Sequence, residues 1–417
     1  MVSNNYFYLN QDVILVQGAK RGSLYDLNTR SVFSIDENSK RLLVELQSGV
    51  DLSTFFVKHT DFQKSEVMSY LNKLAETKLG NFWNSQKKET VVVSSLQKMV
   101  FPMRFFWFEV TPRCNLRCIH CYNESGPELP HIIYDKEKMI KIMQRMYDYG
   151  CKNIHFIGGE PLILGELLGE LIICARKIGF NFIEVFSNLT LLNRRMLDIF
   201  VDNNISIATS IYGPNGAIHD MITKQPGSFD KTIKAVKQIL NAGMNIRTST
   251  IKMKQNAEYI EDTNTFLKKL GINNSKSDIV RPAGRGEQSA LLTEALIQES
   301  LFKQPRFWEC DRKQFFKSNW GHNCFIERVS VNYNGDIFPC IMEKTLLGNV
   351  LEEDMIQIMD KKLMQSVRFM SKDNIEKCKD CEYRYCCFDC RVKRISDKIN
   401  SAPSDCSYNP YTGVWKT

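Results

Sequence analysis

Three cysteines lie within eight positions of this 417-residue chain: Cys114, Cys118 and Cys121. A structural zinc site takes four ligands, usually as two close pairs, and His120 is adjacent to Cys121 and badly placed to share its metal. Three thiolates on one loop suit a cubane iron–sulfur cluster instead, with one iron left without a protein ligand. A molecule that carries an amine and a carboxylate could chelate that iron.

Most of the other cysteines gather near the C-terminus. Of the 14 cysteines, nine lie between positions 310 and 406, and only Cys151 and Cys174 lie between the two groups. The N-terminus has no basic stretch followed by an apolar one, so we expect no secretion and a cytoplasmic location. In that compartment clustered cysteines indicate metal ligation or chemistry rather than disulfides. The sequence has no run of about 18 apolar residues, so we expect no membrane span.

The elements that must position the first three cysteines follow a regular pattern. From residue 104, short apolar strands alternate with helical stretches, which is typical of a parallel α/β sheet, open or curled into a partial barrel. Cys114 follows the first strand, at the end of the sheet where such folds bind ligands. The predicted strands are 105–110, 153–157, 182–187, 205–211, 245–251 and 277–282, and the predicted helices are 135–149, 166–178, 192–203, 229–242 and 257–269.

The flanking regions differ from this core. Residues 5–35 contain short strand candidates, and helical patterns follow near 36–48 and 63–78, which together predict a small winged-helix-like module. Residues 84–100 are interpreted as a linker. After about residue 300 the alternation fades and one helix is expected at 352–370; the region is rich in cysteine, so metal could hold it together. We therefore expect three domains, at 1–95, 100–300 and 305–417.

The cysteine loop, with Tyr122 after its third cysteine, resembles the signature of radical S-adenosylmethionine (SAM) enzymes. Three more stretches resemble motifs of that family, each after a predicted strand: GGEP at 158–161, SNLT at 187–190 and SIYGP at 210–214. The resemblance implies an α/β fold with a partial (β/α)6 barrel, a [4Fe–4S] cluster and bound SAM. The residues that it implies for SAM binding are Gly158, Gly159, Glu160, Ser187, Asn188 and Ser210.

The chemistry implied by this family is reductive. An electron from the cluster splits SAM into methionine and a 5′-deoxyadenosyl radical, which abstracts hydrogen from an unactivated carbon, while the protein positions the cofactor and excludes water. An electron donor such as flavodoxin or ferredoxin is implied. The chain departs from the family at Tyr212, where aspartate is usual, and at Ile222-Thr223, where Arg-Gly is frequent. The group that accepts the substrate's proton is not identified; Tyr212, Arg281 and Arg285 are candidates, each with a structural role as the alternative.

The C-terminal cysteines resemble the SPASM arrangement, an appendage that holds two further four-iron clusters. The resemblance is carried by Gly335-x4-Cys340 and Cys378-x2-Cys381-x5-Cys387-x2-Cys390. Two points stay open: Cys386 could replace Cys387, and without Cys310 one cluster would keep an open iron to which a substrate thiolate could bind. Zinc is the alternative for this region. The implied ligand sets are Cys310, Cys324, Cys340 and Cys390 for one cluster, and Cys378, Cys381, Cys387 and Cys406 for the other.

The resemblance also implies a peptide substrate. SPASM-bearing radical SAM proteins mostly modify peptides, and the N-terminal module resembles the element with which maturases of ribosomally made peptides capture a leader as an extra strand. Lys20 and Arg21 favour an acidic leader. The chain's net charge of +8 fits either such a partner or an ordinary solvated surface. We expect no nucleic-acid partner.

The implied reaction is a thioether or carbon–carbon crosslink in a precursor peptide. The C-terminal CSYNPYTGVW resembles the grasp-with-SPASM subfamily. One alternative is formylglycine formation in a sulfatase, although Ile341 stands where those maturases carry an aspartate base. Another is a non-catalytic leader-binding scaffold, and the N-terminal module could also be a structural cap on the barrel.

Overall fold

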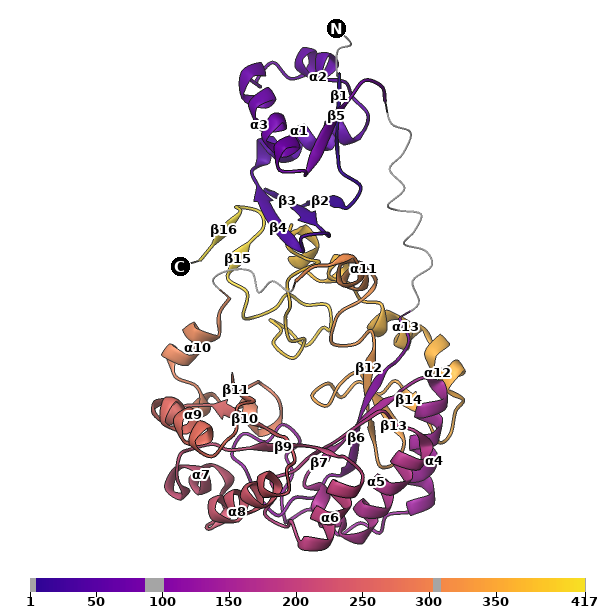
Figure 1. The fold of residues 1–417 in the computed structure, drawn as a ribbon, viewed down its shortest axis with the longest axis vertical. Coiled ribbons are helices and arrows are strands. Elements are labelled where there is room, and N and C mark those ends of the chain that lie inside the picture. The colour runs from indigo at the N-terminus through magenta and orange to yellow at the C-terminus, as the bar shows by residue number, and fades with distance from the viewer. Residues whose placement is uncertain (1–4, 87–100, 303–308, 417) are drawn as a thin grey trace.

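The computed structural model of the chain describes residues 5–86, 101–302 and 309–416. The molecule is elongated, with an N-terminal unit at one end, a large sheet at the other and the cysteine-rich C-terminal region between them (Figure 1). The predicted linker at 84–100 lies largely outside the described residues. Within the described residues, no helix is both long and apolar enough to cross a membrane.

The N-terminal unit combines two small antiparallel sheets with three helices. Its core is a cluster of buried aliphatic and aromatic side chains around Phe7, Leu43 and Phe55. Helix α2 and strand β5 are absent from the sequence prediction, because seven and four residues are too short to show a clear period. The elements are β1 (Tyr6–Leu9) paired with β5 (Gly80–Trp83), the sheet β2 (Val13–Gln17), β3 (Gly22–Asp26) and β4 (Ser31–Ile35), and helices α1 (Glu37–Gln47), α2 (Leu52–Lys58) and α3 (Lys64–Glu76).

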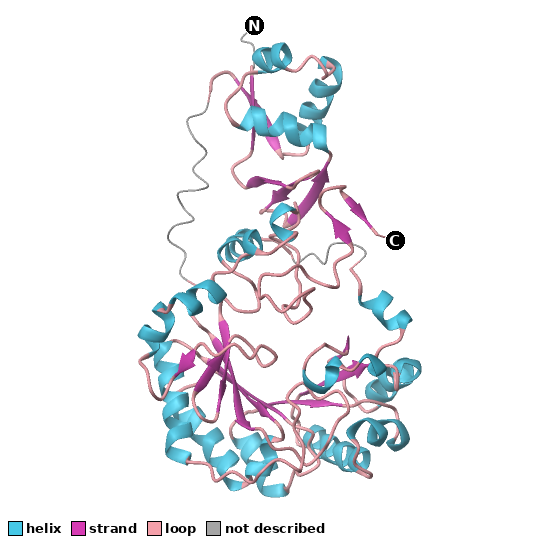
Figure 2. Cartoon of the chain, turned by 180° about the vertical axis from the view of Figure 1, so that it is seen from behind, coloured by secondary structure: helices cyan, strands magenta, loops and turns pink. Residues whose placement is uncertain are grey.

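Six parallel strands form the central sheet, in which each strand pairs with its neighbours in the sequence, in the order β11-β10-β9-β8-β7-β6. Helices follow the strands and cover the outer face (Figure 2). The predicted α/β fold with a partial barrel is confirmed. The strands are β6 (Phe105–Thr111), β7 (Asn153–Gly158), β8 (Phe182–Phe186), β9 (Ser206–Ser210), β10 (Ile246–Lys252) and β11 (Ser275–Ile279); the helices are α4 (Lys136–Tyr149), α5 (Glu166–Ile178), α6 (Arg194–Asp202), α7 (Gly216–Thr223), α8 (Ser228–Asn241) and α9 (Ile260–Lys269).

Alternation along the strands divides the side chains between two environments. On β6 and β7, Phe106, Phe108, Ile154 and Phe156 are fully buried in the main hydrophobic core beneath the helices. Trp107, between the two phenylalanines, faces the other way and lines a cavity. One face of the sheet therefore stabilises the fold, and the other is available for a ligand.

The sheet continues into the C-terminal region. Strand β12 (Arg328–Asn332) pairs in parallel with β6, so that Arg328 lies opposite Phe105 and Asn332 opposite Glu109. The sequence predicted a single helix at 352–370, but the structure has two. Lys361, whose backbone is extended, ends the first of them. The remaining elements are β13 (Asp336–Phe338), β14 (Gly348–Asn349), β15 (Tyr408–Asn409) and β16 (Val414–Trp415), with helices α10 (Glu294–Ser300), α11 (Arg312–Trp320), α12 (Met355–Asp360) and α13 (Lys362–Arg368).

The N-terminal unit rests on the C-terminal region rather than on the barrel. The backbone N–H of Ala19 donates to the Asp380 carbonyl at 2.8 Å, and that of Lys20 donates to the Pro410 carbonyl at 3.0 Å. The hydroxyl of Tyr25 on β3, which is fully buried, donates to the Glu382 carbonyl at 2.9 Å. These contacts attach the β2-β3-β4 sheet directly to the segment that carries most of the cysteines.

Candidate active site

The loop with Cys114, Cys118 and Cys121 leaves β6 at the carboxyl end of the sheet. Its backbone is held by the end of α7, since Arg117 N–H donates to the Thr223 carbonyl and Ile119 N–H to the Ile222 carbonyl, both at 3.0 Å. Ile222 and Thr223 are the residues at which the chain departs from the Arg-Gly of the family motif. At these positions backbone carbonyls orient the loop, so the change of side chain leaves this contact intact.

Arg285 holds the same loop from the opposite side. Its Nε donates to the Cys118 carbonyl at 2.9 Å, its Nη2 donates to the Ser125 carbonyl at 2.6 Å, and its backbone N–H donates to the Cys121 carbonyl at 3.0 Å. A guanidinium carries only donors and stays charged. The geometry therefore makes Arg285 a positioning residue for the loop rather than an acceptor of the substrate's proton.

The three thiols face one cavity of about 360 Å³. The pKa of Cys118 is raised to about 12, mainly by burial and in part by Cys121, while Arg285 lowers it. Burial and the carboxylate of Glu160 likewise raise the pKa of Cys114, with smaller contributions from the other two thiols. The mutual effect shows that the three sulfurs are close together, and a metal that binds them must displace their protons.

Two glycines allow the end of β7 to approach this loop. A Cβ on Gly158 would meet the backbone of Thr111, and a Cβ on Gly159 would meet the carbonyls of Pro112 and Arg113. Gly158 also has a φ of +138°, which side chains disfavour. The sequence marked both glycines as SAM-binding residues; the structure shows that they first make room for the backbone that leads into Cys114.

Glu160 joins the ends of two strands, β7 and β8. It is fully buried and accepts hydrogen bonds from Ser187 Oγ at 2.6 Å, Asn188 N–H at 2.7 Å and Leu162 N–H at 2.9 Å. Burial raises the pKa of this carboxyl to about 7, against the lowering effect of its three donors. The six residues predicted for SAM binding therefore lie together at the ends of β7, β8 and β9: Gly158, Gly159, Ser187, Asn188 and Ser210 line the cavity, and Glu160 lies behind them.

Several buried polar atoms on the cavity wall have no hydrogen-bond partner within the described part of the chain. They are His120 Nδ1, Tyr122 OH and Ser125 Oγ, all on or next to the cysteine loop. Buried polar groups are normally satisfied, so these three atoms indicate a polar ligand. A nucleoside joined to an amino acid offers donors and acceptors of the kind that they lack.

Four of the C-terminal cysteines line a second, smaller cavity of about 30 Å³: Cys378, Cys381, Cys387 and Cys406. The pKa of Cys378 is raised to about 12. Burial is the largest cause, Cys387 and Cys406 contribute to the rise, and Lys372 lowers the pKa in part. We call these residues the four-cysteine group. They are the set predicted for one of the two additional clusters, and Cys387 rather than Cys386 belongs to it.

Three more cysteines form a separate group. The pKa of Cys340 is raised to about 12, mainly by burial. Cys324 and Cys390 contribute to the rise, which places the three thiols near one another. Arg281 is near all three thiols. Burial alone would lower the pKa of Arg281, but the three thiols and Asp278 together raise it. Arg281 lines the large cavity, as do Ile341 and Met342 after Cys340, so this three-cysteine group borders the large cavity.

Cys310 and Cys386 line neither of the two cavities. They belong to an apolar cluster against which Cys381, Cys387 and Cys406 of the four-cysteine group pack. Cys310 is fully buried, with its Sγ 3.8 Å from the Tyr385 carbonyl, in an apolar cluster that also contains Tyr25 and Phe315. Cys386 is in the same cluster, where the Tyr25 hydroxyl is 3.4 Å from its Sγ. The structure thus does not bring Cys310 to Cys324, Cys340 and Cys390, because the chain before α11 packs beneath the N-terminal unit.

Comparisons with known proteins agree with this arrangement. The family model described as the radical SAM superfamily matches residues 108–267, and that of an iron–sulfur cluster-binding domain, SPASM, matches residues 324–382. The chain is a radical SAM protein with a SPASM domain. Its enzyme class is therefore the radical SAM oxidoreductases, and its cofactors are SAM and [4Fe–4S] clusters.

Relatives of this radical SAM protein include a bacteriocin biosynthesis protein and a heme synthase. It is 24% identical over 356 residues to the subtilosin biosynthesis protein AlbA of Bacillus subtilis, which covers 81% of this chain and 78% of that protein. It is 23% identical over 346 residues to an AdoMet-dependent heme synthase of Methanosarcina barkeri; the match covers 74% of this chain and 97% of that protein. Among solved structures, Streptococcus suis SuiB bound to precursor peptide SuiA superimposes with a TM-score of 0.56 at 16% identity, covering 95% of this chain and 98% of that one.

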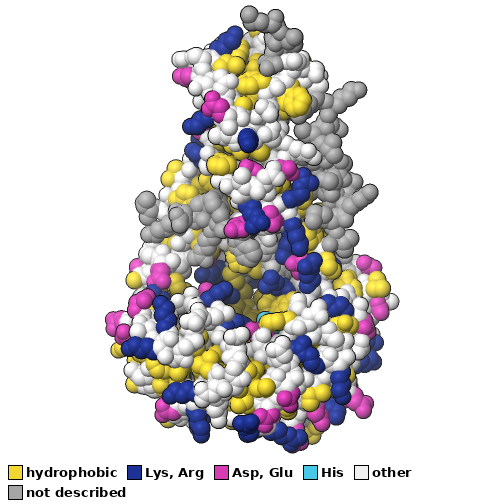
Figure 3. Space-filling view, viewed as in Figure 1, with side chains coloured by type: hydrophobic (Ala, Val, Ile, Leu, Met, Phe, Trp, Pro, Cys, Tyr) yellow, Lys and Arg dark blue, Asp and Glu magenta, His cyan; other side chains and the backbone are white. Residues whose placement is uncertain are grey.

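Sequence reasoning singled out Tyr212 of the radical SAM site but missed His219, which supports it. Tyr212, which replaces the usual aspartate, is almost fully buried, lines the cavity and packs edge-on against His120 at 4.8 Å between ring centroids. His219 accepts a hydrogen bond from Tyr212 N–H at 3.2 Å and supports it from behind. His219 is not part of any motif named above. Only its position, about five residues after the SIYGP segment, could have suggested it. Figure 3 shows the molecular surface hollowed between barrel and SPASM domain, with hydrophobic and basic side chains gathered there.

Proposed function

We propose that this protein is a peptide maturase that abstracts hydrogen from a ribosomally made precursor peptide and installs a crosslink. The observation that carries the proposal is the N-terminal unit, docked on the SPASM domain through Ala19, Lys20 and Tyr25. The match to peptide-bound SuiB covers 95% of this chain, whereas that to a sulfatase-maturase-type structure, anSMEcpe, covers 74%. The difference is about the size of the N-terminal unit.

The proposal assigns the domains and site residues as the sequence suggested. Residues 1–95 would recognise the peptide, 100–300 form the radical SAM barrel and 305–417 the SPASM domain. Cys114, Cys118 and Cys121 would hold a cluster that, with SAM bound, supplies the 5′-deoxyadenosyl radical. The GGEP, SNLT and SIYGP segments, with Glu160 behind them, would orient SAM, and Tyr212 and Trp107 would exclude water from the cavity.

The leader would bind as an added strand on the N-terminal sheet. In the order β2-β3-β4, the outer strands are β2 and β4. The β2 side is already occupied, because the Gln17 carbonyl accepts from Arg384 at 2.7 Å and the next turn is bonded to the SPASM domain. Strand β4, where Phe33 is 44% exposed, is the better edge for a peptide. The neighbouring Lys20 and Arg21 favour acidic leader residues.

The three-cysteine group favours a thioether over a carbon–carbon bond. With Cys310 held elsewhere, Cys324, Cys340 and Cys390 would leave one iron of a cubane without a cysteine ligand. A thiol is a natural ligand for that position. Because Ile341, Met342 and Arg281 connect this group to the large cavity, a cysteine of the substrate could reach it from there.

The test uses the full-length protein, reconstituted anaerobically with iron and sulfide and supplied with SAM and dithionite. Its substrate is a peptide encoded by a small cysteine-containing reading frame, which is first sought beside the gene. We expect 5′-deoxyadenosine and a peptide lighter by two hydrogens, which loses one site for thiol alkylation if a thioether forms. Cys118→Ala should give neither product. An unchanged mass loss in Cys118→Ala, or SAM cleavage with no change in the peptide, would contradict the proposal.

A further inference from the structure

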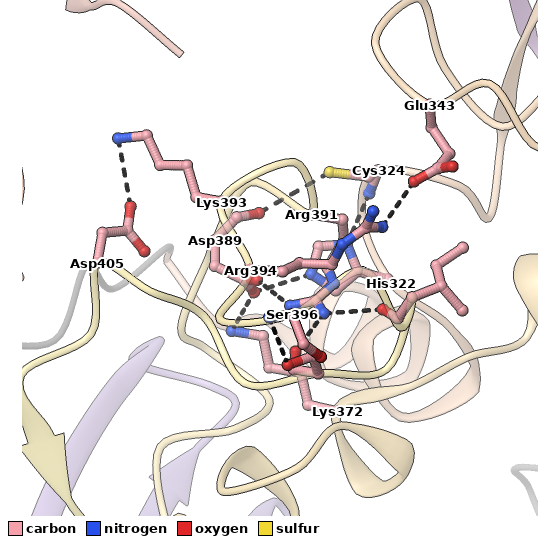
Figure 4. A network of polar contacts seen from close by, with 12 residues as sticks. His322, Cys324, Glu343, Lys372, Asp389, Arg391, Lys393, Arg394, Ser396 and Asp405 are labelled. Carbon is pink, nitrogen blue, oxygen red and sulfur yellow. Dashed lines mark hydrogen bonds and ion pairs between the residues drawn. The ribbon is translucent and has the colours of Figure 1, made fainter. Parts of the chain in front are cut away.

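A buried charge network lies between the two C-terminal cysteine groups. Its centre is Asp389, which is fully buried and stands in the chain between Cys387 of the four-cysteine group and Cys390 of the three-cysteine group. Lys372, His322 and Arg391 point toward its carboxylate from three directions (Figure 4). All three are themselves more than nine-tenths buried.

The contacts on the carboxylate are short. Lys372 Nζ lies 2.8 Å from Asp389 Oδ1, His322 Nε2 lies 2.9 Å from the same oxygen, and Arg391 Nη1 lies 2.7 Å from Oδ2. Arg391 is fixed further by the carbonyls of Ile399 and Ser401, to which its Nη2 donates. Asp389 therefore joins its near neighbour Arg391 to Lys372 and to His322, which lies 67 residues away in the sequence.

The network reaches both cysteine groups. On one side, Lys372 and Asp389 line the same small cavity as Cys378, Cys381, Cys387 and Cys406. On the other side, the N–H of Cys324 donates to His322 Nδ1 at 3.1 Å. Because Nδ1 accepts this bond, the ring proton is on Nε2, and His322 can donate it to Asp389 while remaining neutral.

The charges do not cancel. Lys372 and Arg391 are cations, Asp389 is the one anion and His322 is neutral in this tautomer, so the network keeps one net positive charge away from water. Stability alone is a weak reason for such a group, since a buried ion network often contributes less than apolar side chains of the same volume. A positive charge beside a cluster, by contrast, favours its reduced form, because net charge and burial set the cluster's potential.

We propose that Lys372, Asp389 and His322 form an electrostatic bridge between the two auxiliary cluster sites, in which Lys372 makes the four-cysteine cluster easier to reduce and Asp389 holds that charge in place. These are positioning residues: they touch neither substrate nor SAM. The bridge is independent of which peptide is modified and of the bond that is made.

The experiment is an EPR-monitored redox titration of the full-length, anaerobically reconstituted protein, with its iron content measured alongside. The signals that do not respond to added SAM report the auxiliary clusters. In Lys372→Met we expect one auxiliary midpoint potential to become more negative, and Lys372→Arg should restore it. Lys317→Met is the matched control, because Lys317 is a similarly shielded lysine paired with Glu327 on the outside of both groups.

Each outcome bears on the bridge. If Lys372→Met loses iron and Lys372→Arg keeps it, the bridge is supported, because the charge at position 372 rather than the shape of the side chain then decides whether the cluster is retained. Equal iron loss in both variants, or unchanged potentials at full iron content, would overturn it. Failure of the proposed function has a different signature: no change in peptide mass, with the effect of Lys372→Met on the potential still present.

Discussion

The radical SAM site and the SPASM cysteine sites are built by opposite means. Around Cys114, Cys118 and Cys121 the loop is held by backbone carbonyls, two glycines and one arginine, and the thiols face a cavity of about 360 Å³. Around the four-cysteine group the cavity is only about 30 Å³, and its wall contains a buried ion network. The first site therefore has room for a ligand beside its thiols, whereas the four-cysteine group does not.

The largest effect expected is that of Cys118→Ala. Removal of one of three thiolates leaves too few ligands for the first cluster, so release of 5′-deoxyadenosine should fall to background. If the two regions are independent, iron and EPR signals of the SPASM domain persist. A variant that keeps cleaving SAM would show that the open site is not where SAM is split.

Arg285→Ala tests whether the loop depends on its clamp. The guanidinium makes two hydrogen bonds to loop carbonyls, and charged donors are worth about 1.5–3 kcal/mol each, so we expect roughly a tenfold or greater loss of SAM cleavage, with iron lost from the first site only. Arg194→Ala removes an exposed ion pair with Asp198 on α6 and serves as the control. Equal SAM-cleaving activities of the two variants would show that Arg285 does not hold the cysteine loop in its active position.

Gly159→Ala tests the close approach at the end of β7. The added Cβ meets backbone carbonyls that cannot rotate away, and we expect a loss of about 1–3 kcal/mol in stability together with weaker SAM binding. In Gly216→Ala the nearest atoms, Asp220 Oδ2 and Phe229 Cβ, are 3.7 and 3.8 Å from the new Cβ, so this control should be neutral. Thermal unfolding and SAM titration, both under anaerobic conditions, measure the difference.

The smallest effect expected is on the pH dependence of SAM binding. Burial raises the pKa of Glu160 to about 7 in the free protein. From behind the cavity wall, the ionised carboxylate favours the ammonium group of SAM and the protonated one does not. Affinity is therefore highest at pH 8 and above, has fallen to about half at pH 7 and continues to decline below it. Between pH 8 and pH 6 the ionised fraction falls about tenfold, and Kd from anaerobic calorimetry should rise by that factor. Tighter binding at pH 6 would reverse the assigned role.

The barrel was predictable because its signals are local. Alternating strands such as 105–110 and amphipathic helices such as 135–149 appear within about one residue of their predicted positions. The cysteine, GGEP, SNLT and SIYGP segments follow strand ends, so parallel topology alone brings them together. Strand β11 begins two residues earlier than predicted, because its SKSDI sequence is polar and lies at the edge of the sheet.

The contacts that were not predictable join residues far apart in the chain. Nothing around 328–332 indicates that β12 pairs with β6, more than two hundred residues earlier. Arg285 lies about 160 residues from the carbonyls that it binds, and Cys310 follows a packing preference for Tyr25 and Phe315 that its spacing from other cysteines does not reveal. Such partners become visible only when the tertiary structure is known.

The pairing of β12 with β6 makes barrel and SPASM domain a single cooperative body. Residues 328–332 pair with the outer edge of β6, the strand that leads into Cys114. Backbone hydrogen bonds between the two strands leave no hinge there and hold the cysteine groups at a fixed spacing. Cutting the chain after the barrel would expose that edge as a template for intermolecular pairing. A truncated protein should accordingly precipitate rather than survive as a minimal SAM-cleaving enzyme.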